Sequence, residues 1–269
     1  MSGGEKRVRH VLGLSGGKDS SALAIYMRER VPEMEYVFCD TGKELPETYE
    51  FLTRMEAYLG KPILRLTSEQ DFDHYLAVFN GYLPSSRMRW CTRLLKLRPF
   101  ERYVGDDVVV NYVGIRADEH REGYVSTKPN IRSVFPFRDD GVTKADVVRI
   151  LEEAGLGMPG YYRWRSRSGC FFCFFQRKEE WVGLAREHPD FFAEAKAYEK
   201  VDPESGERFT WRKGETLDEL VAKELAREGE APARQPAARR NLPLVSVFDA
   251  GEDDEEGDEE DRACLICEL

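Results

Sequence analysis

Short apolar segments alternate with amphipathic segments along the first 155 residues of the chain. The apolar segments have the length of buried strands and lie at 9–14, 36–39, 62–66 and 108–114. A helix is expected to begin at Pro46, because the residues after it place apolar side chains on one helical face. That face consists of Phe51, Leu52, Met55, Tyr58 and Leu59. Strands that alternate with helices predict an α/β fold with an open, mostly parallel twisted sheet and helices on both faces.

The remaining segments suggest how the chain is organised. Helices are expected near 70–79 and 91–104, and Thr143 with Asp146 forms a capping box that begins another. After Gly229 no periodic apolar face remains. We therefore expect an α/β domain at 1–160, a smaller helical C-terminal layer at 161–228, and a linker with a flexible acidic tail at 229–269.

The net charge of −10 is concentrated at the end of the chain. Residues 251–269 hold ten acidic residues and one basic residue, which leaves a net charge of −1 on residues 1–250. The body is therefore close to neutral, and an anionic partner such as nucleic acid is not excluded. No apolar run approaches the about 18 residues of a membrane helix, and the N-terminus has no apolar signal core. We expect a cytoplasmic protein without a membrane partner.

A glycine-rich turn stands between the first predicted strand and its helix. Its sequence is Ser15-Gly16-Gly17-Lys18-Asp19-Ser20. Free N–H groups at a helix N-terminus attract phosphate, glycines allow close approach, and Lys18 adds a positive charge. The pattern differs from the Gly-x-x-x-x-Gly-Lys-Ser/Thr loop of kinases and GTPases. The sequence therefore predicts a phosphate-binding turn of another kind.

This hexapeptide is similar to the signature of the N-type ATP pyrophosphatases, the PP-loop enzymes. Three further segments resemble the phosphoadenosine phosphosulfate reductase-like branch. They are Asp40-Thr41-Gly42 with Pro46-Glu47-Thr48-Tyr49, then Gly114-Ile115-Arg116-Ala117-Asp118-Glu119, then Arg167-Ser168-Gly169-Cys170-Phe171-Phe172-Cys173. The likeness covers residues 8 to 180 and implies an adenine nucleotide alpha hydrolase-like fold. In that fold Asp40 and the turn after it lie beside the nucleotide, at the carboxyl ends of the strands.

The resemblance implies ATP and Mg²⁺ as ligands. Sulfonucleotide reductases generally lack the lysine in this turn, so Lys18 favours cleavage of ATP. A substrate oxygen is expected to attack the α-phosphate while Mg²⁺ bridges the leaving pyrophosphate. The expected catalytic residues are Lys18, Asp19, Asp40 and Arg116. The expected nucleotide-binding residues are Leu14, Ser15, Gly16, Gly17, Lys18, Asp19, Ser20, Asp40, Thr41, Gly42 and Gly114.

Six cysteines in a chain expected in a reducing compartment indicate metal or redox chemistry rather than disulfides. Cys170 and Cys173 form a Cys-x-x-Cys pair among four phenylalanines, and the long spacing from Cys91 is similar to that of iron–sulfur members of the branch. The expected metal ligands are Cys91, Cys170 and Cys173, with Cys267 as a fourth. Spacing does not separate a [4Fe-4S] cluster from tetrahedral zinc, and buried inert thiols are the alternative. For Cys39 we favour an inert thiol.

Basic and aromatic residues are mixed in two segments, 87–102 and 163–178. Such mixtures suit phosphate backbones and stacked bases, although charged helix faces are often only solvated.

The preferred function is an ATP pyrophosphatase that adenylates a substrate for sulfur incorporation. It is most similar to the ATP pyrophosphatase component of DNA phosphorothioation, with tRNA thiolation second. The expected partners are nucleic acid and a cysteine desulfurase or other sulfur donor. The oligomeric state stays open, with a homodimer as one alternative. Two alternatives remain: a sulfonucleotide (APS/PAPS) reductase, and a non-catalytic nucleotide-binding assembly subunit.

Overall fold

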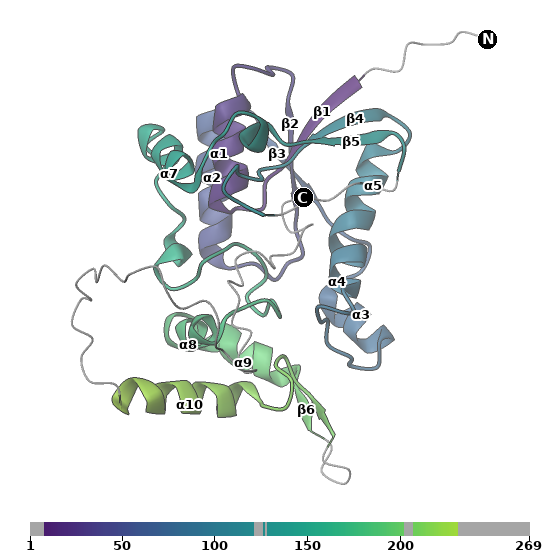
Figure 1. Cartoon of the computed structure of the whole chain (residues 1–269). Coiled ribbons are helices and arrows are strands. Elements are labelled where there is room, and N and C mark those ends of the chain that lie inside the picture. Colours follow the sequence, from purple (N-terminus) through teal and green to yellow (C-terminus); the bar gives the residue numbers. More distant parts are fainter. Residues whose placement is uncertain (1–7, 121–125, 127, 202–206, 231–269) are drawn as a thin grey trace, which may run out of the picture.

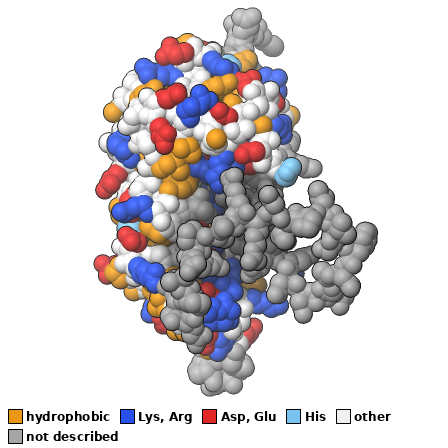
Figure 2. Space-filling model, turned by 60° about the vertical axis from the view of Figure 1, so that its left-hand side comes forward, with side chains coloured by type: hydrophobic (Ala, Val, Ile, Leu, Met, Phe, Trp, Pro, Cys, Tyr) orange, Lys and Arg blue, Asp and Glu red, His pale blue; other side chains and the backbone are white. Residues whose placement is uncertain are grey.

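The computed structural model describes residues 8–120, 126, 128–201 and 207–230 (Figure 1). The predicted acidic tail and Cys267 lie outside these residues. In the described ranges, no helix combines the length and the apolar composition that crossing a membrane requires. Figure 2 shows basic and acidic side chains interspersed over the upper part of one face, as expected for a body that is close to neutral.

Five parallel strands form the central sheet, in the order β3-β2-β1-β4-β5. They are β1 (Val8–Gly13), β2 (Glu35–Cys39), β3 (Ile63–Leu66), β4 (Val108–Tyr112) and β5 (Ile131–Val134). The parallel sheet confirms the predicted fold class, and the first four strands lie where the apolar segments predicted them. The fifth strand was not predicted. The chain returns to the other side of β1 for β4, so a ligand is expected outside the carboxyl ends of β1 and β4.

Helices cover both faces of this sheet (Figure 1). One face is covered by α1 (Lys18–Met27), α2 (Pro46–Leu59) and α7 (Lys144–Glu153), and the other by α5 (Arg98–Val104). Side chains alternate along a strand, so Leu12 packs into the core beneath α1 while Val11 packs beside Phe100 of α5. The apolar cores on the two faces of the sheet fix the orientation of β1 about its own axis. They therefore also fix the direction in which the chain leaves β1 at Leu14.

The segment 91–104, which was expected to be one basic helix, contains three consecutive helical elements of different geometry. These are α4 (Trp90–Thr92), a π-helical stretch η1 (Arg93–Leu97) and α5. The N–H of Arg98 donates to the carbonyl of Arg93, five residues earlier. Pro99 has no N–H for an α-helical bond, and a wider turn just before it accommodates the ring.

Two shorter helices, α3 (Phe72–Val78) and α6 (Pro136–Asp139), complete the sheet region. The predicted capping box at α7 is confirmed, since the N–H of Thr143 donates to the Asp146 carboxylate at 3.0 Å.

The C-terminal layer lies below the sheet in Figure 1 and shares an aromatic core with it. Its elements are η2 (Gly160–Arg163), α8 (Lys178–Glu187), α9 (Pro189–Ala197), β6 (Lys200–Val201), β7 (Arg208–Phe209) and α10 (Leu217–Glu230). Its regular elements are helices except for the β6–β7 hairpin, which was not predicted. Phe172 packs against Phe72 and Trp211, with ring centroids 4.3 and 5.1 Å apart. This core holds the C-terminal layer against the carboxyl edge of the sheet.

Candidate nucleotide site

The turn between β1 and α1 depends on two glycines. Gly16 has φ +73°, and a Cβ there would lie 2.5 Å from Cγ2 of the buried Thr48. Gly17 is the N-cap of α1, and a Cβ there would lie 2.7 Å from Oγ of Ser168. Because Gly17 has no capping side chain, the positive dipole end of α1 is directed at this turn and suits an anion.

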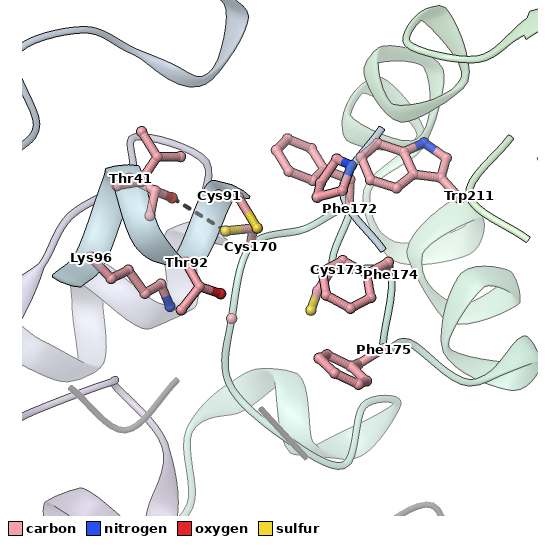
Figure 3. A pocket seen from close by; sticks show the side chains of 13 residues that line it. Thr41, Cys91, Thr92, Lys96, Cys170, Phe172, Cys173, Phe174, Phe175 and Trp211 are labelled. Atoms are coloured by element: carbon pink, nitrogen blue, oxygen red, sulfur yellow. Dashed lines mark hydrogen bonds between the residues drawn. The ribbon is translucent and has the colours of Figure 1, made fainter. Parts of the chain in front are cut away.

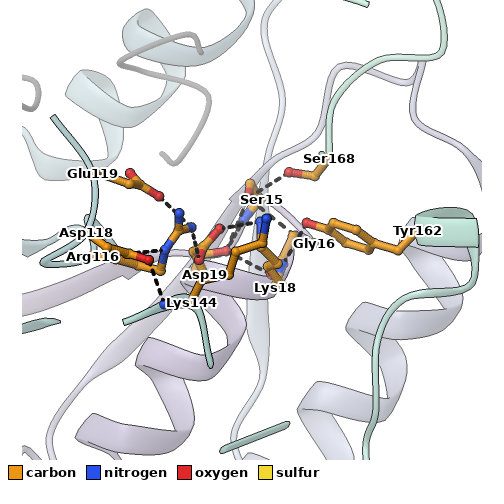
Figure 4. Close-up of polar contacts among 12 residues, drawn as sticks. Ser15, Gly16, Lys18, Asp19, Arg116, Asp118, Glu119, Lys144, Tyr162 and Ser168 are labelled. Carbon is orange, nitrogen blue, oxygen red and sulfur yellow. Dashed lines mark hydrogen bonds and ion pairs between the residues drawn. The ribbon is translucent and has the colours of Figure 1, made fainter. Parts of the chain in front are cut away.

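Two serines within the turn, and one from the C-terminal layer, fix its shape (Figure 4). The N–H of Ser15 donates to Oγ of Ser20 at 3.2 Å, and the two hydroxyl groups are 3.1 Å apart. Ser168 donates its hydroxyl to Oγ of Ser15 at 3.0 Å. The hydroxyl groups of residues 15 and 20 therefore tie the turn to itself and to the layer below it.

Two tyrosines of η2 also hold the turn, and sequence reasoning missed both. The hydroxyl of Tyr161 donates to the carbonyl of Gly16 at 2.7 Å, and Tyr161 is completely buried. The hydroxyl of Tyr162 accepts from the N–H of Lys18 at 3.1 Å, and its ring lies under the Lys18 ammonium. No local pattern predicts contacts between segments that are more than 140 residues apart.

Buried charges of both signs meet at the start of α1 (Figure 4). The ammonium of Lys18 lies 3.0 Å from one carboxylate oxygen of Asp19, and Nη1 of Arg116 lies 2.7 Å from the other. Arg116 also contacts Asp118 at 2.9 Å and Glu119 at 2.5 Å. Burial lowers the pKa of Arg116, but Asp19 and Glu119 outweigh it and hold that pKa above its ordinary value. Arg116 is therefore a permanent cation, and it is only about 6% exposed.

Gly114 and Leu14 shape the turn between β1 and α1 through their backbone. A Cβ on Gly114 would lie 3.0 Å from the carbonyl carbon of Asp19, so glycine lets the end of β4 approach the start of α1. The side chain of Leu14 is fully buried, and its N–H donates to the carbonyl of Val37 at 2.7 Å. Leu14 thus anchors the turn to β2, and its side chain faces the core.

Asp40, Thr41 and Gly42 follow β2 at the same edge of the sheet. One oxygen of Asp40 accepts from the N–H of Gly42 at 2.9 Å and from the hydroxyl of Tyr49 at 2.8 Å. The three residues line an open hollow of about 440 Å³, together with the polar segment 67–71 and Leu95. Hydroxyl, amide and carboxylate groups in such a hollow suit the ribose and base of a nucleotide.

Glu44 is a buried carboxyl group that the sequence did not single out. Thr41 donates its hydroxyl to Glu44 at 2.8 Å, and Glu44 is 5% exposed. Burial raises the pKa of Glu44. The sulfur of Cys170 lies 3.3 Å from the hydroxyl oxygen of Thr41 and 3.8 Å from the Glu44 carboxyl. Thr41 therefore connects the hollow beside Asp40 to the cysteines.

Cys91, Cys170 and Cys173 line one cavity, walled by aromatic rings (Figure 3). The cavity is small, with a volume of about 30 Å³. Thiols suit iron or zinc, but among the described residues no three His, Cys, Asp or Glu side chains are grouped to hold a metal ion. Cys267, the expected fourth ligand, lies outside the described residues. Cys91, Cys170 and Cys173 thus share a cavity, and their role as metal ligands stays a prediction from the sequence.

Several basic residues of the two mixed segments point inward. Arg165 is 2% exposed and donates to the carbonyls of Gly169 and Cys170 at 3.0 and 2.8 Å. Lys96 is also buried. Arg89 and Arg167 each hold a guanidinium 4.9 Å from the ring of Phe175. Only part of the basic character of these segments is therefore available at the surface.

Comparison with known proteins relates this site to a family. Residues 9–155 match the model of the phosphoadenosine phosphosulfate reductase domain. An uncharacterized protein of Methanocaldococcus jannaschii is 28% identical over 193 residues, covering 66% of this chain and 39% of that protein. A second from the same organism is 23% identical over 189 residues, covering 66% and 44%. The chain thus spans less than half the length of these two relatives.

Two further similarities come from a phage and a fungus. An uncharacterized nin region protein of Escherichia phage lambda is 27% identical over 211 residues, covering 65% of this chain and 69% of that protein. A crystal structure of phosphoadenylyl-sulfate (PAPS) reductase from Candida auris, in a phosphate complex, aligns with a TM-score of 0.47 at 15% identity. That alignment covers 60% of this chain and 81% of the reductase.

Substitution of Gly16 by alanine is expected to distort the turn. Both Gly16 and Gly42 have left-handed backbones, but only a Cβ at Gly16 meets another group, Thr48. We expect Gly42→Ala to cost about 1 kcal/mol of unfolding free energy and Gly16→Ala about 2–3 kcal/mol or more. Urea unfolding of both variants measures the difference. Equal losses of unfolding free energy in the two variants would show that the contact with Thr48 does not require glycine at position 16.

Cys39 is expected to be inert in the folded protein. Its thiol is 1% exposed and donates to the carbonyl of Lys96 at 3.6 Å, and burial raises the pKa of Cys39 to about 12. The thiol therefore stays protonated from neutral pH until the pH approaches that value, whereas the unfolded thiol ionises near pH 8.5. Alkylation by iodoacetamide, followed by peptide mass spectrometry, should modify Cys39 only in urea. Equal rates for Cys39 in buffer and in urea would contradict its burial.

Proposed function

The chain belongs to the phosphoadenosine phosphosulfate reductase domain family, and on that premise we propose that it is an ATP pyrophosphatase. It would cleave ATP to AMP and pyrophosphate and so adenylate an acceptor for sulfur incorporation. The observation that carries the proposal is Lys18, a buried ammonium at the N-terminus of α1 in a turn suited to phosphate. A nucleotide that already carries sulfate needs no triphosphate cleavage, so a lysine at this point favours ATP.

The turn and its charges supply the binding and the electrostatic stabilisation. The Lys18 ammonium lies 3.0 Å from an Asp19 oxygen at the start of α1. When ATP binds, Lys18 would leave this oxygen and bind a phosphate oxygen instead. Arg116 keeps Asp118 and Glu119 as partners during that exchange. Cations held in place before the reaction stabilise the charge that develops on pyrophosphate without reorganising. The acceptor oxygen forms a bond to the α-phosphorus as the bond from that phosphorus to the bridging oxygen of pyrophosphate breaks.

Asp19 and Asp40 are the carboxylates that would hold Mg²⁺. They would fit this ion, because Mg²⁺ is usually held by one or two carboxylates together with the phosphates of the substrate. The Asp19 oxygen that contacts Lys18 would become available once Lys18 binds a phosphate, and the hydrogen bonds from Gly42 and Tyr49 use only one of the two Asp40 oxygens. The ion, when bound, supplies positive charge to the leaving pyrophosphate.

The position of the thiols supports a role in sulfur chemistry. Cys170 lies 3.3 Å from Thr41, whose neighbour Asp40 lines the proposed nucleoside hollow. A sulfur nucleophile would attack the adenylated acceptor and release AMP. We propose nucleic acid as the acceptor, in DNA phosphorothioation or tRNA thiolation, and a cysteine desulfurase or another donor as the sulfur source. A [4Fe-4S] cluster or zinc at the cysteines stays a prediction from the sequence, and none of the proposed steps depends on it.

A sulfonucleotide reductase is the second candidate. The family itself and the three cysteines around one cavity favour it. Such an enzyme would form sulfite from adenylyl sulfate or its 3′-phosphorylated form and would not release pyrophosphate from ATP. Incubation with each nucleotide, followed by assays for sulfite and pyrophosphate, separates the two candidates.

Lys18→Ala is expected to remove most of the pyrophosphate release. Loss of one preorganised donor at a developing anion lowers a rate by about 10²–10³. Release of AMP from ATP labelled in the α-phosphate measures the effect, in the presence of Mg²⁺ and candidate acceptors. Arg28→Ala is the matched control, because it removes an exposed positive charge at the other end of the same helix. Pyrophosphate release by Lys18→Ala at the wild-type rate would rule out the proposed role of Lys18.

A further inference from the structure

We infer that a basic and aromatic hollow beside the thiol cavity binds single-stranded nucleic acid. The hollow has a volume of about 460 Å³ and lies between the segment before α4, the start of α8 and the turn after β7. Its identity as the acceptor site rests on the proposed function, whereas its affinity for nucleic acid does not.

Three cations line this hollow, from two segments of the C-terminal layer. They are Lys178, Arg212 and Lys213. Within the part of the chain that the structure describes, no carboxylate forms an ion pair with any of them. Glu215 is the one acidic residue of the lining, and its carboxylate lies 4.0 Å from Lys223. The hollow therefore has an excess of positive charge, which suits the phosphates of a polyanion.

Flat side chains form the inner wall of the hollow. Phe174 and Phe175 both line it, with ring centroids 4.4 Å apart. The guanidinium groups of Arg89 and Arg167 each lie 4.9 Å from the Phe175 ring. Aromatic rings and guanidinium planes stack on unpaired bases, which a duplex keeps inside its own stack. Rings together with cations thus favour a single strand over a duplex.

The wall of the hollow is shared with the thiol cavity. Phe174, Phe175 and Trp211 line both spaces. Thr41 and Cys170 line the thiol cavity as well (Figure 3). A strand in the hollow would therefore lie next to the thiols, with the proposed nucleotide site on the far side of the same cavity.

The charge of the hollow is tested with the full chain and a fluorescent single-stranded DNA of about 15 nucleotides. The triple variant K178A/R212A/K213A should bind at least about tenfold more weakly by fluorescence anisotropy. Its plot of log affinity against log salt concentration should be shallower by about 2, because each phosphate that a cation neutralises adds about 0.7 to the slope. The variant R28A/R132A/R149A removes the same charge from exposed positions of the sheet region and should bind like wild type. Equally weakened binding by both triple variants would overturn the inference, because binding would then follow net charge alone.

The aromatic wall is tested by Phe174→Leu, which keeps an apolar side chain and removes the ring. Loss of one stacked base should weaken binding by about 5- to 150-fold, while Phe174→Tyr should bind like wild type. Wild-type affinity of Phe174→Leu, or tighter binding of a duplex of the same sequence, would overturn the single-strand assignment. Circular dichroism and thermal unfolding of each variant exclude loss of fold as the cause.

The two proposals fail separately. Release of AMP from ATP without added nucleic acid reports on the pyrophosphatase, and anisotropy without ATP reports on the hollow. A wild-type protein that binds the strand but yields no AMP supports the hollow and contradicts the proposed function. A protein that yields AMP but binds neither DNA nor RNA single strands supports the proposed function and contradicts the inference about the hollow.

Discussion

The carboxylate of Asp19 joins two buried cations that arrive from different strands of the sheet. Lys18 follows β1 and Arg116 follows β4, and each lies within 3.0 Å of one Asp19 oxygen. Two cations buried side by side would repel each other, so the carboxylate between them is what allows both to occupy the switch point of the sheet. Because Gly114 lets β4 approach this point, the backbone and the charges impose the same arrangement. The phosphate-binding proposal depends on it.

The C-terminal layer completes the site at this edge of the sheet. Tyr161, Tyr162 and Ser168 each bond to a residue of the turn, and the Cys170 sulfur contacts Thr41. The aromatic core around Phe172 holds these groups in position. A nucleotide in the turn would thus meet groups from both parts of the chain, so the two parts cannot act independently.

The sequence predicted those features that are local. The first four strands, the Thr143 capping box and the glycine turn each carry a periodicity or a cap within a few residues. Strand β5 has the sequence Ile-Arg-Ser-Val, in which only Ile131 is buried, so it shows no apolar run. Glu44, Tyr161 and Tyr162 were missed because their roles arise from tertiary contacts. The cysteines are an intermediate case. The sequence predicted that Cys91, Cys170 and Cys173 lie together, and they line one cavity, but the distances between their sulfur atoms depend on tertiary packing.

The most direct test of the central claim is a structure of the protein with Mg²⁺ and an ATP analogue whose α,β-bridge cannot be cleaved. We predict that all three phosphates lie against residues 15–20, with the Lys18 ammonium bonded to a phosphate oxygen and the ribose toward Asp40. Phosphates bound elsewhere, or a Lys18 that keeps its contacts with Tyr162 and Asp19 when the analogue is at saturation, would contradict this prediction.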